Sequence, residues 1–407
     1  MTKPALALSS AAFLSIVLLA SLLVRLPTLQ RVRLPSGEIL YRHLEYDELI
    51  FQTLIERVQK EPLGYTLQGT PLLAHTPPWI YDRPIFFHPP AFVYLGAAAG
   101  KAGLPLPLLP VLLNLATIAL VYWTGRRLYG EEAARWAAVL AAVCPVGWFV
   151  SQRIWIDNMA TAATTAAFAA AVWASARPSP RSFALAGTAF GLAFLSKVPG
   201  ALILPAMLLI AWTRGRSGLN AATAGSFLAP ALALPAAWLL LYKLGTGDWL
   251  QRLPPADFVE SNPFVKMAHD RPWHYYFSSL AALCPAYLLA LWRLRRRCAA
   301  DAGPAAWCAA FWLVLTGFGM MGGVFQTRFV APAYPALALL AGAEAAALGP
   351  TGTIAFTSLA GYGMMNAAVY AVSDSPEFAD FRKSVAGLAW DRVSRVAGAR
   401  PAAPGPR

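Results

Sequence analysis

Charged residues are scarce in this sequence. Only 13% of its 407 residues are Asp, Glu, Lys or Arg, whereas soluble domains carry about 25%. Hydrophobic residues make up 57% of the chain. This composition argues against two or three soluble domains and predicts one membrane-embedded body, which we place at residues 1–372.

A basic stripe or an RNA-binding motif is also missing. The chain has 33 Lys and Arg against 20 Asp and Glu, a formal net charge of +13. In so apolar a chain, basic residues usually mark the cytoplasmic ends of transmembrane helices. The excess of positive charge therefore argues for a membrane orientation and against a nucleic-acid partner.

Cysteine is rare as well, and no two of the four cysteines have C-x-x-C spacing. The sequence therefore indicates neither a zinc site nor a redox pair. We expect Cys144, Cys284, Cys298 and Cys308 to be small apolar residues in or beside helices.

Long uncharged runs are plentiful, and most of them approach the ~17–25 residues that cross a bilayer as a helix. Eleven runs lack Asp, Glu, Lys and Arg: 4–24, 102–125, 136–152, 158–176, 182–196, 198–213, 217–242, 272–292, 302–327, 329–343 and 345–373. The first could be a signal peptide, but it has no clear small-x-small cleavage site, so we interpret it as an uncleaved span. The sequence predicts an all-α integral membrane protein with about 11 transmembrane helices.

The short loops between these runs alternate in charge. One side carries Arg126, Arg127, Arg135, Arg177, Arg181, Arg214, Arg216, Arg293, Arg295, Arg296 and Arg297, and the other only Arg153, Lys197 and Arg328. Eleven basic residues against three predict that the first side is cytoplasmic. A twelfth apolar run, 84–100, would break this alternation if it crossed. We therefore expect it to lie along the outer membrane surface.

Two long loops then face outward, 28–101 and 243–271. Within the first, residues 48–59 have a partly apolar helical face preceded by Asp47, which predicts an interfacial helix with an acid near its positive end. The tail, 373–407, ends in Pro, Ala and Gly and is expected to be partly disordered.

Ionisable residues gather at the outer ends of the spans. They are Asp47, Glu48, His88, Arg153, Asp157, Lys197, His269, Asp270, Arg271 and Arg328. Each one could simply mark a helix end in the headgroup region. Their concentration on one face favours a shared polar site, because such groups are costly near a membrane.

Chemistry narrows what such a site could do. A carboxylate can act as a general base toward a hydroxyl. Arg and Lys can hold a phosphate, Arg through a two-pronged contact and Lys as a point charge. The residues therefore predict an acid beside a phosphate site at the outer leaflet, and do not by themselves name a substrate.

Six local motifs resemble those of the C-type membrane glycosyltransferases, which include bacterial lipid A aminoarabinose transferases and protein O-mannosyltransferases. They are Tyr46-Asp47-Glu48, Phe87-His88-Pro89-Pro90, the acid-bearing segment Arg153–Asp157, the Gly191–Lys197 segment, His269-Asp270-Arg271-Pro272-Trp273-His274-Tyr275-Tyr276, and the Thr327–Pro335 segment. They occur in the family's order and cover about residues 40–340. We expect no β-trefoil domain like that of the eukaryotic O-mannosyltransferases, which argues against that branch of the family.

The resemblance implies transfer of a sugar from a polyprenyl-phosphate donor, with inversion, to a lipid, glycan or protein acceptor. Asp47 would deprotonate a hydroxyl acceptor, whereas a phosphate acceptor would need no base. Asp157 would face the sugar or a cation, and Glu48 would be a second acid or only a helix-start charge. The donor's phosphate and sugar would be bound by Lys197, Arg271, Arg328, Arg153, His88 and His269. No metal ligands or cofactor are assigned, although a divalent metal is compatible with this chemistry. The expected location is a bacterial inner membrane, with the site facing the periplasm or exterior.

A transporter or flippase of lipid-linked sugars is the alternative. It should place ionisable groups near the bilayer midplane and show paired broken helices or internal repeats. Here the ionisable groups lie at span ends and no repeat is evident, which favours the enzyme. A non-catalytic scaffold would leave the concentration of acids and bases unexplained.

Overall fold

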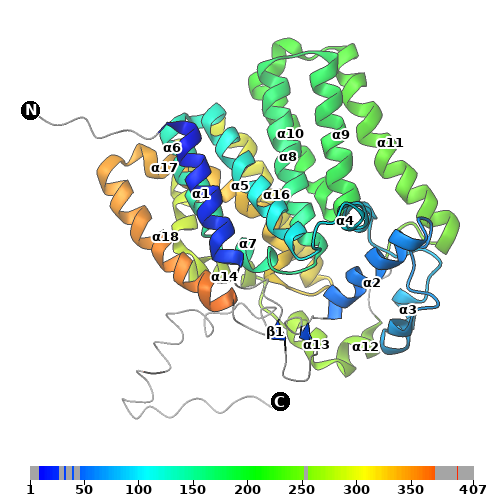
Figure 1. Cartoon of the computed structure of the whole chain (residues 1–407). Helices are drawn as coiled ribbons and strands as arrows, with labels where there is room; N and C mark the ends of the chain where they lie inside the picture. The colour runs from blue at the N-terminus through cyan, green and yellow to red at the C-terminus, as the bar shows by residue number, and fades with distance from the viewer. Residues whose placement is uncertain are drawn as a thin grey trace, which may run out of the picture.

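The computed structural model describes residues 9–26, 32–33, 39–40, 46–251, 255–371 and 392. Most of these residues are helical (Figure 1). The longer helices are α1 (Ser10–Arg25), α5 (Leu108–Tyr129), α6 (Glu131–Ala142), α8 (Ile156–Ala176), α9 (Pro180–Ser196), α10 (Leu204–Gly215), α11 (Ala221–Thr246), α16 (Ala302–Met320), α17 (Tyr334–Ala347) and α18 (Gly349–Ala371). The strands β1 (Val32–Arg33) and β2 (Ile39–Leu40) form one short antiparallel pair.

Shorter helices lie between the long ones and at one end of the bundle. They are α2 (Tyr46–Lys60), α3 (Pro78–Tyr81), α4 (Ala91–Lys101), α7 (Pro145–Val150), α12 (Ala256–Ser261), α13 (Pro263–His269), α14 (Tyr275–Leu283) and α15 (Leu288–Arg293). The 3₁₀ helices beside them include η3 (Val198–Ile203), η5 (Pro285–Tyr287) and η8 (Thr327–Ala333). Figure 1 shows α2, α3, α12 and α13 gathered at the lower end of the bundle. These helices belong to the two long loops that the charge count predicts to face outward.

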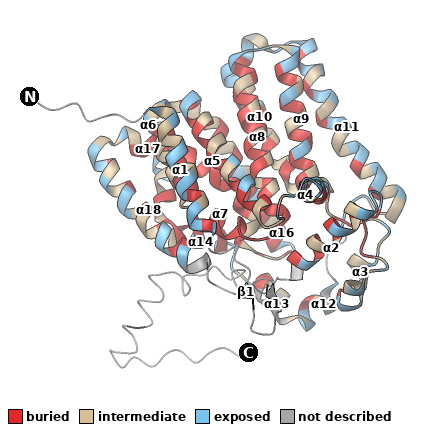
Figure 2. Cartoon of the chain, viewed as in Figure 1, coloured by how far each residue is buried: buried red, intermediate tan, exposed pale blue. Residues whose placement is uncertain are grey.

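The bundle turns an apolar surface outward, as a membrane requires. Figure 2 shows buried residues where the helices meet and exposed ones along the outside of α1, α11 and α18. Along α11 the exposed side chains include leucines: Leu228, Leu232, Leu240, Leu241 and Leu244. A surface of this kind is stable against lipid tails, so the chain is an integral, multi-pass membrane protein.

Six of the described helical segments are long and apolar enough to span a membrane, or seven if the bent pair α14–α15 counts as one span. The six are Leu108–Tyr129, Ile156–Ala176, Val198–Gly215, Ala221–Thr246, Ala299–Met320 and Thr327–Ala347. Most of the other predicted spans correspond to shorter helices, such as α1 with 16 residues, or to interrupted ones, such as α6 and α7. Helix α18 is long enough, with 23 residues, but is not among the six. The predicted count of eleven is therefore not confirmed, although the all-α membrane architecture is.

Proline breaks two of the predicted runs. The run 136–152 divides before Pro145, where α7 begins, and the run 272–292 bends by 114° between α14 and the segment that starts at Pro285. A proline lacks the N–H of a regular helix and disfavours helix in the residue before it. Uninterrupted spans were the wrong expectation at these two places.

Helix α17 forms the centre of the bundle, and almost all of it is buried. It packs against α6 at very short range, because a Cβ added at Gly342 would lie 2.6 Å from the backbone N of Ala137. Helix α9 packs along both α8 and α11. These contacts fix the helix ends from which the site is built.

The predicted interfacial helix at 48–59 is present as α2, which begins at Tyr46 and packs on α4. Helix α4 contains most of the apolar run 84–100, and the residues of that run before Ala91 are not helical. It has 11 residues and is about 16 Å long, half the ~30 Å of a bilayer core. Apart from Arg392, the predicted tail 373–407 lies outside the described residues.

Candidate active site

Asp47 forms an ion pair with Arg328 at the end of the bundle that the charge count predicts to face outward, here called the outer end. Asp47 is in the first turn of α2, and Arg328 is the second residue of η8. The Nη2 group of Arg328 donates to Oδ2 of Asp47 at 2.6 Å, and its Nε donates to Oε1 of Gln326, also at 2.6 Å. Residues 281 positions apart are thus joined, and the Asp47 side chain remains 32% exposed.

Asp157 forms a second pair of the same kind with Lys197. Asp157 is in the first turn of α8, and Lys197 caps the outer end of α9. Their Nζ and Oδ1 atoms are 2.7 Å apart, and both side chains are largely buried. The sequence separated these two residues by 40 positions, and the packing of α8 on α9 brings them together.

Aromatic rings join the two ion pairs. The Arg328 guanidinium lies over the Trp155 ring, 4.1 Å from its centroid. Lys197 Nζ is 4.5 Å from the centroid of Phe329, which Arg328 also approaches at 5.6 Å. We call Asp47, Asp157, Lys197, Arg328, Trp155 and Phe329 the outer cluster. Cations over aromatic faces keep their charge while one side is shielded from water.

Glu48 is buried, with 1% of its surface exposed, although it follows Asp47 directly. Its Oε1 accepts a hydrogen bond from the backbone N–H of Ile154 at 2.9 Å, and Arg153 Nη1 lies 3.4 Å from its Oε2. Glu48 does lie in the first turn of α2, but its carboxylate is buried against this loop and is not exposed to the headgroup region. Glu48 ties α2 to the loop that leads into Asp157.

The loop between α7 and α8 is also held by hydrogen bonds from Asn158. Asn158 Nδ2 donates to the carbonyl oxygens of Val150 at 2.7 Å and of Arg153 at 3.1 Å. The Arg153 guanidinium lies 5.0 Å from the Phe149 ring centroid, and its side chain is 1% exposed. Arg153 therefore acts through Glu48 and the loop and is too buried to serve as an open phosphate ligand.

His88 lies among aromatic rings beside the outer cluster. Its ring is 4.1 Å from the Phe87 centroid and stacks on Phe51 at 6.0 Å. Burial lowers the pKa of His88 well below its usual value, and the charges of Lys197 and Arg328 lower that pKa further. His88 is thus a neutral neighbour of the two cations.

Arg271 and His269 contact the chain segment that precedes Arg328. Arg271 Nη1 donates to the carbonyl oxygen of Phe325 at 3.0 Å, and His269 Nδ1 is 3.0 Å from the carbonyl oxygen of Gly323. The Arg271 guanidinium also lies 4.2 Å from the Tyr275 ring centroid. Arg271 and His269 therefore hold the segment before Arg328 and are not part of the outer cluster. The predicted site residues that the structure does bring together are Asp47, Asp157, Lys197 and Arg328.

No group of three or more His, Cys, Asp or Glu within the described part of the chain could hold a metal ion. Asp47, Asp157 and Glu48 each face a cation. With each carboxylate engaged by an arginine or a lysine, this arrangement of donors does not fit a divalent cation.

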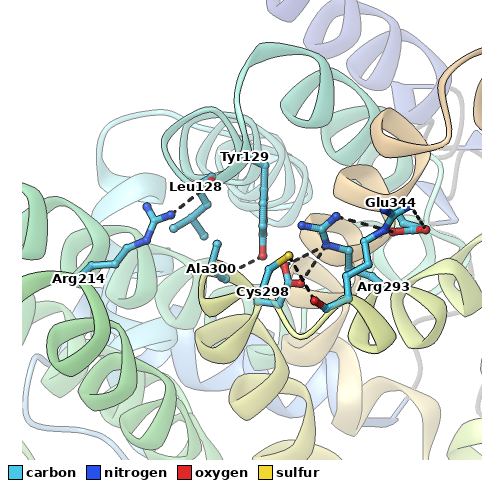
Figure 3. A network of polar contacts seen from close by, with 9 residues as sticks. Leu128, Tyr129, Arg214, Arg293, Cys298, Ala300 and Glu344 are labelled. Atoms are coloured by element: carbon cyan, nitrogen blue, oxygen red, sulfur yellow. Dashed lines mark hydrogen bonds and ion pairs between the residues drawn. The ribbon is translucent and has the colours of Figure 1, made fainter.

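A second polar network, absent from the sequence predictions, lies at the opposite end of the bundle (Figure 3). Glu344 of α17 is fully buried and faces Arg296, which contacts both of its oxygens at 2.7 and 3.0 Å. Arg293 pairs with Asp301 at 3.0 Å and approaches Glu344 at 3.7 Å. We call these four residues the inner network. One signal was available, because Glu344 is the single charged residue between the runs 329–343 and 345–373.

Sequence reasoning also missed Trp155 and Phe329, which lie inside two of the motifs but carry no charge. Arg25 was missed too. It is fully buried at the end of α1, where its Nε donates to Ser151 Oγ at 2.9 Å and its guanidinium lies over Trp148. Arg25 directly follows the apolar run 4–24. Its place in the sequence does not reveal that its partner, Ser151, lies in the core.

Residues 87–242 match a protein family described as dolichyl-phosphate-mannose-protein mannosyltransferase. The matched stretch includes His88, Asp157 and Lys197, and Asp47 and Arg328 lie outside it. No curated protein sequence matches the chain significantly.

Solved structures of similar fold cover nearly all of the chain. Apo ArnT from Cupriavidus metallidurans is 16% identical, with a TM-score of 0.60 over 96% of this chain and 79% of that one. ArnT bound to undecaprenyl phosphate gives 14% identity, a TM-score of 0.61 and the same coverage. The apo oligosaccharyltransferase of Archaeoglobus fulgidus gives 16% and 0.50, over 96% of this chain and 58% of that one. These structures confirm the predicted all-α membrane fold, and the family match over residues 87–242 agrees with the resemblance to the C-type membrane glycosyltransferases.

Proposed function

We propose that this protein transfers a sugar from a polyprenyl-phosphate donor to an acceptor at the outer face of the membrane. The observation that carries the proposal is the outer cluster, in which two carboxylates and two cations converge from α2, α8, α9 and η8. The family match over residues 87–242 supports the same reaction class. ArnT, which shares the fold, has been crystallised with undecaprenyl phosphate bound.

The proposed reaction is a direct displacement at the anomeric carbon. The acceptor oxygen forms a bond to this carbon while the bond to the donor phosphate breaks, and the bonding electrons leave with the polyprenyl phosphate. Attack from the opposite side inverts the anomeric centre. Asp47 takes the proton of a hydroxyl acceptor. If the acceptor is a phosphate, this step is not needed and Asp47 orients the acceptor.

Lys197 and Arg328 neutralise the phosphate that departs. Each cation is fixed by one carboxylate and one aromatic face, so its charge is in place before the reaction begins. Such preorganised charge is often the largest single contribution to catalysis. A phosphate that draws Arg328 to itself would release Asp47 to act on the acceptor.

A transporter would place its ionisable groups near the middle of the membrane. The outer cluster lies at helix ends instead: Asp157 is in the first turn of α8, and Lys197 follows the last residue of α9. This placement and the family match favour transfer over transport.

The reaction is tested with the purified protein, a polyprenyl-phosphate sugar and candidate acceptors. We expect loss of the donor and appearance of a glycosylated acceptor by mass spectrometry. The same measurement on glycolipids and envelope glycans from a deletion strain should identify the missing product. A purified protein that moves intact donor across vesicles without cleaving it would instead establish transport.

We further infer that the cluster faces the periplasm or exterior of a bacterial cell. Cysteines introduced at Leu63, which is 92% exposed, and at exposed Glu260 test this orientation. Both should react with an impermeant thiol reagent in intact cells. The exposed native Cys298, beside the inner network, should react only after permeabilisation. The reverse pattern would contradict the proposed orientation.

A further inference from the structure

A groove of about 740 Å³ opens on the bundle surface between α1, α5, α8 and α9, far from the outer cluster. Its volume falls within the roughly 300–1,000 Å³ of ligand sites. Three small residues of α8, Ala166, Ala169 and Ala170, line one wall, and Ala11 and Leu14 of α1 line another. The small side chains of α8 leave space that larger residues would fill. The lining is almost entirely apolar, so its natural content is a hydrocarbon chain.

In the membrane orientation inferred above, on which this proposal rests, the groove lies in the inner half of the membrane. It runs along α5 from Ala119 to Arg126 and along α8 from Ala166 to Trp173. Seven residues of helix rise about 10 Å, a third of the ~30 Å bilayer core. Both stretches finish at the cytoplasmic helix ends, and Trp123 and Trp173 line the groove there. Tryptophan is enriched at this level, where lipid headgroups meet hydrocarbon.

Arginines from three elements surround the inner end of the groove. Arg126 lines it, with 58% of its side chain exposed. Arg177 follows the lining residue Trp173 by four positions, and Arg181 precedes the lining residue Leu185 by four. One helical turn separates each pair, so both arginines lie just beyond the groove. Both are exposed, and neither forms an ion pair among the described residues.

Acidic residues nearby do not cancel this charge. Glu131 is shared, because its carboxylate lies 3.3 Å from Arg126 Nε and 3.1 Å from Arg135 Nε and also accepts from the Tyr122 hydroxyl. Glu132 is exposed at the start of α6. Four arginines therefore stand against two carboxylates at this end of the groove.

We propose that this groove binds one anionic phospholipid of the inner leaflet. An acyl chain would occupy the alanine-lined space, and the headgroup phosphate would lie among Arg126, Arg177 and Arg181. Guanidinium groups bind phosphate strongly, and basic pockets between helices on the cytoplasmic side are typical sites for anionic lipid headgroups. The site is separate from the outer cluster and does not depend on the proposed transfer reaction.

Native mass spectrometry of the delipidated, full-length protein tests this site. Dioleoylphosphatidylglycerol and dioleoylphosphatidylcholine are titrated separately. We expect the anionic lipid to bind at least about tenfold more tightly to one site. Arg181→Ala should weaken that preference about threefold or more, and the double variant Arg126→Ala/Arg181→Ala should abolish it. Ala170→Trp fills the groove and should remove the site for both lipids.

Arg216→Ala is the matched control. Arg216 is another exposed arginine at the inner end, stacked on Trp212 at 4.6 Å, and it is not among the residues that line the groove. This variant should keep the full preference for the anionic lipid. Equal binding of the two lipids to the unaltered protein would overturn the proposal, and so would an unchanged preference in Arg181→Ala. A polyprenyl phosphate that binds this site more tightly than the phospholipid would also overturn it, by assigning the groove to the donor's lipid.

Discussion

The two ends of the bundle both hold buried acids and bases, but they bind them differently. In the inner network, Arg296 contacts both oxygens of Glu344, and Arg293 contacts both oxygens of Asp301. In the outer cluster each cation makes a single short contact to its carboxylate. Both cations also lie over aromatic faces, and Arg328 makes a further hydrogen bond to Gln326.

This difference indicates different roles. An arginine that contacts both oxygens of a carboxylate fixes the position of that group, and here such contacts hold helix ends together. The inner network joins α15, α16 and α17 in this way. Single contacts over aromatic rings hold a charge in place and leave it able to exchange one anion for another. The outer end is therefore suited to binding a phosphate, and the inner end to stability.

The largest effect is expected from Asp47→Asn. This change keeps size and shape but removes the base, so transfer to a hydroxyl acceptor should fall about 10²–10⁴-fold. Steady-state assays with purified protein, together with donor binding, measure it. Asp82→Asn is the control, because Asp82 is an exposed acid of the same loop that accepts a hydrogen bond from Gln68. Normal turnover in Asp47→Asn would indicate a phosphate acceptor or leave Asp157 as the base.

The inner network should respond in stability and not in chemistry. Glu344→Gln leaves two guanidiniums facing a neutral amide, and breaking a buried ion pair costs about 3–5 kcal/mol. We expect the thermal midpoint of the detergent-solubilised protein to fall by several degrees, while the turnover of folded molecules at low temperature is unchanged. Glu132→Gln, an exposed acid at the same end, should leave the midpoint in place. A selective loss of turnover in Glu344→Gln would show that the two ends are functionally coupled.

Smaller losses are expected when the outer cations are removed one at a time. Lys197→Ala and Arg328→Ala each remove a charge-assisted contact worth about 1.5–3 kcal/mol, or roughly ten- to a hundredfold in use of the donor. Arg271→Ala should cost less, because Arg271 holds the Phe325 carbonyl. The ratio kcat/KM for the donor measures these effects. Arg83→Ala is the control, because Arg83 pairs with Asp248 in the outer loops, and it should be neutral. Equal losses of kcat/KM in all four variants would show that the outer cluster has no special role in binding the donor phosphate.

Much of the outer cluster could be predicted because charges are conspicuous in an apolar chain. Asp47, Asp157, Lys197 and Arg328 were all expected at one face, and the structure joins them. Which acid meets which cation could not be predicted. Asp47 and Glu48 are neighbours in sequence, but consecutive residues of a helix point about 100° apart. One therefore faces Arg328 and the other is buried against Ile154.

The fold was predictable to a similar depth. The uncharged runs locate the helices. The two helix breaks occur at Pro145 and Pro285, and they could have been predicted from these prolines but not from the distribution of charges. The inner network was missed for a different reason. Arg293 and Arg296 were interpreted only as charges that orient the chain, yet both contact Glu344. Whether an arginine at a helix end meets water or a buried acid depends on packing between helices distant in sequence.

The smallest expected effect is that of pH on His88. Its pKa in the folded protein is lowered, first by burial and then by Lys197 and Arg328, so the ring is neutral around pH 7. The unfolded chain takes up a proton near pH 6.5. Below that value the unfolded state binds more protons at this site, so His88 opposes folding as the pH falls and ceases to do so above it. His88→Gln, which never titrates, should therefore be less sensitive to acid than the unaltered protein between about pH 5.5 and 7. Turnover should show no ionisation near pH 6.5 in either form. A turnover step near pH 6.5 that vanishes in His88→Gln would mean that a charged His88 joins Lys197 and Arg328 in binding the phosphate, and the outer cluster would then contain a third cation.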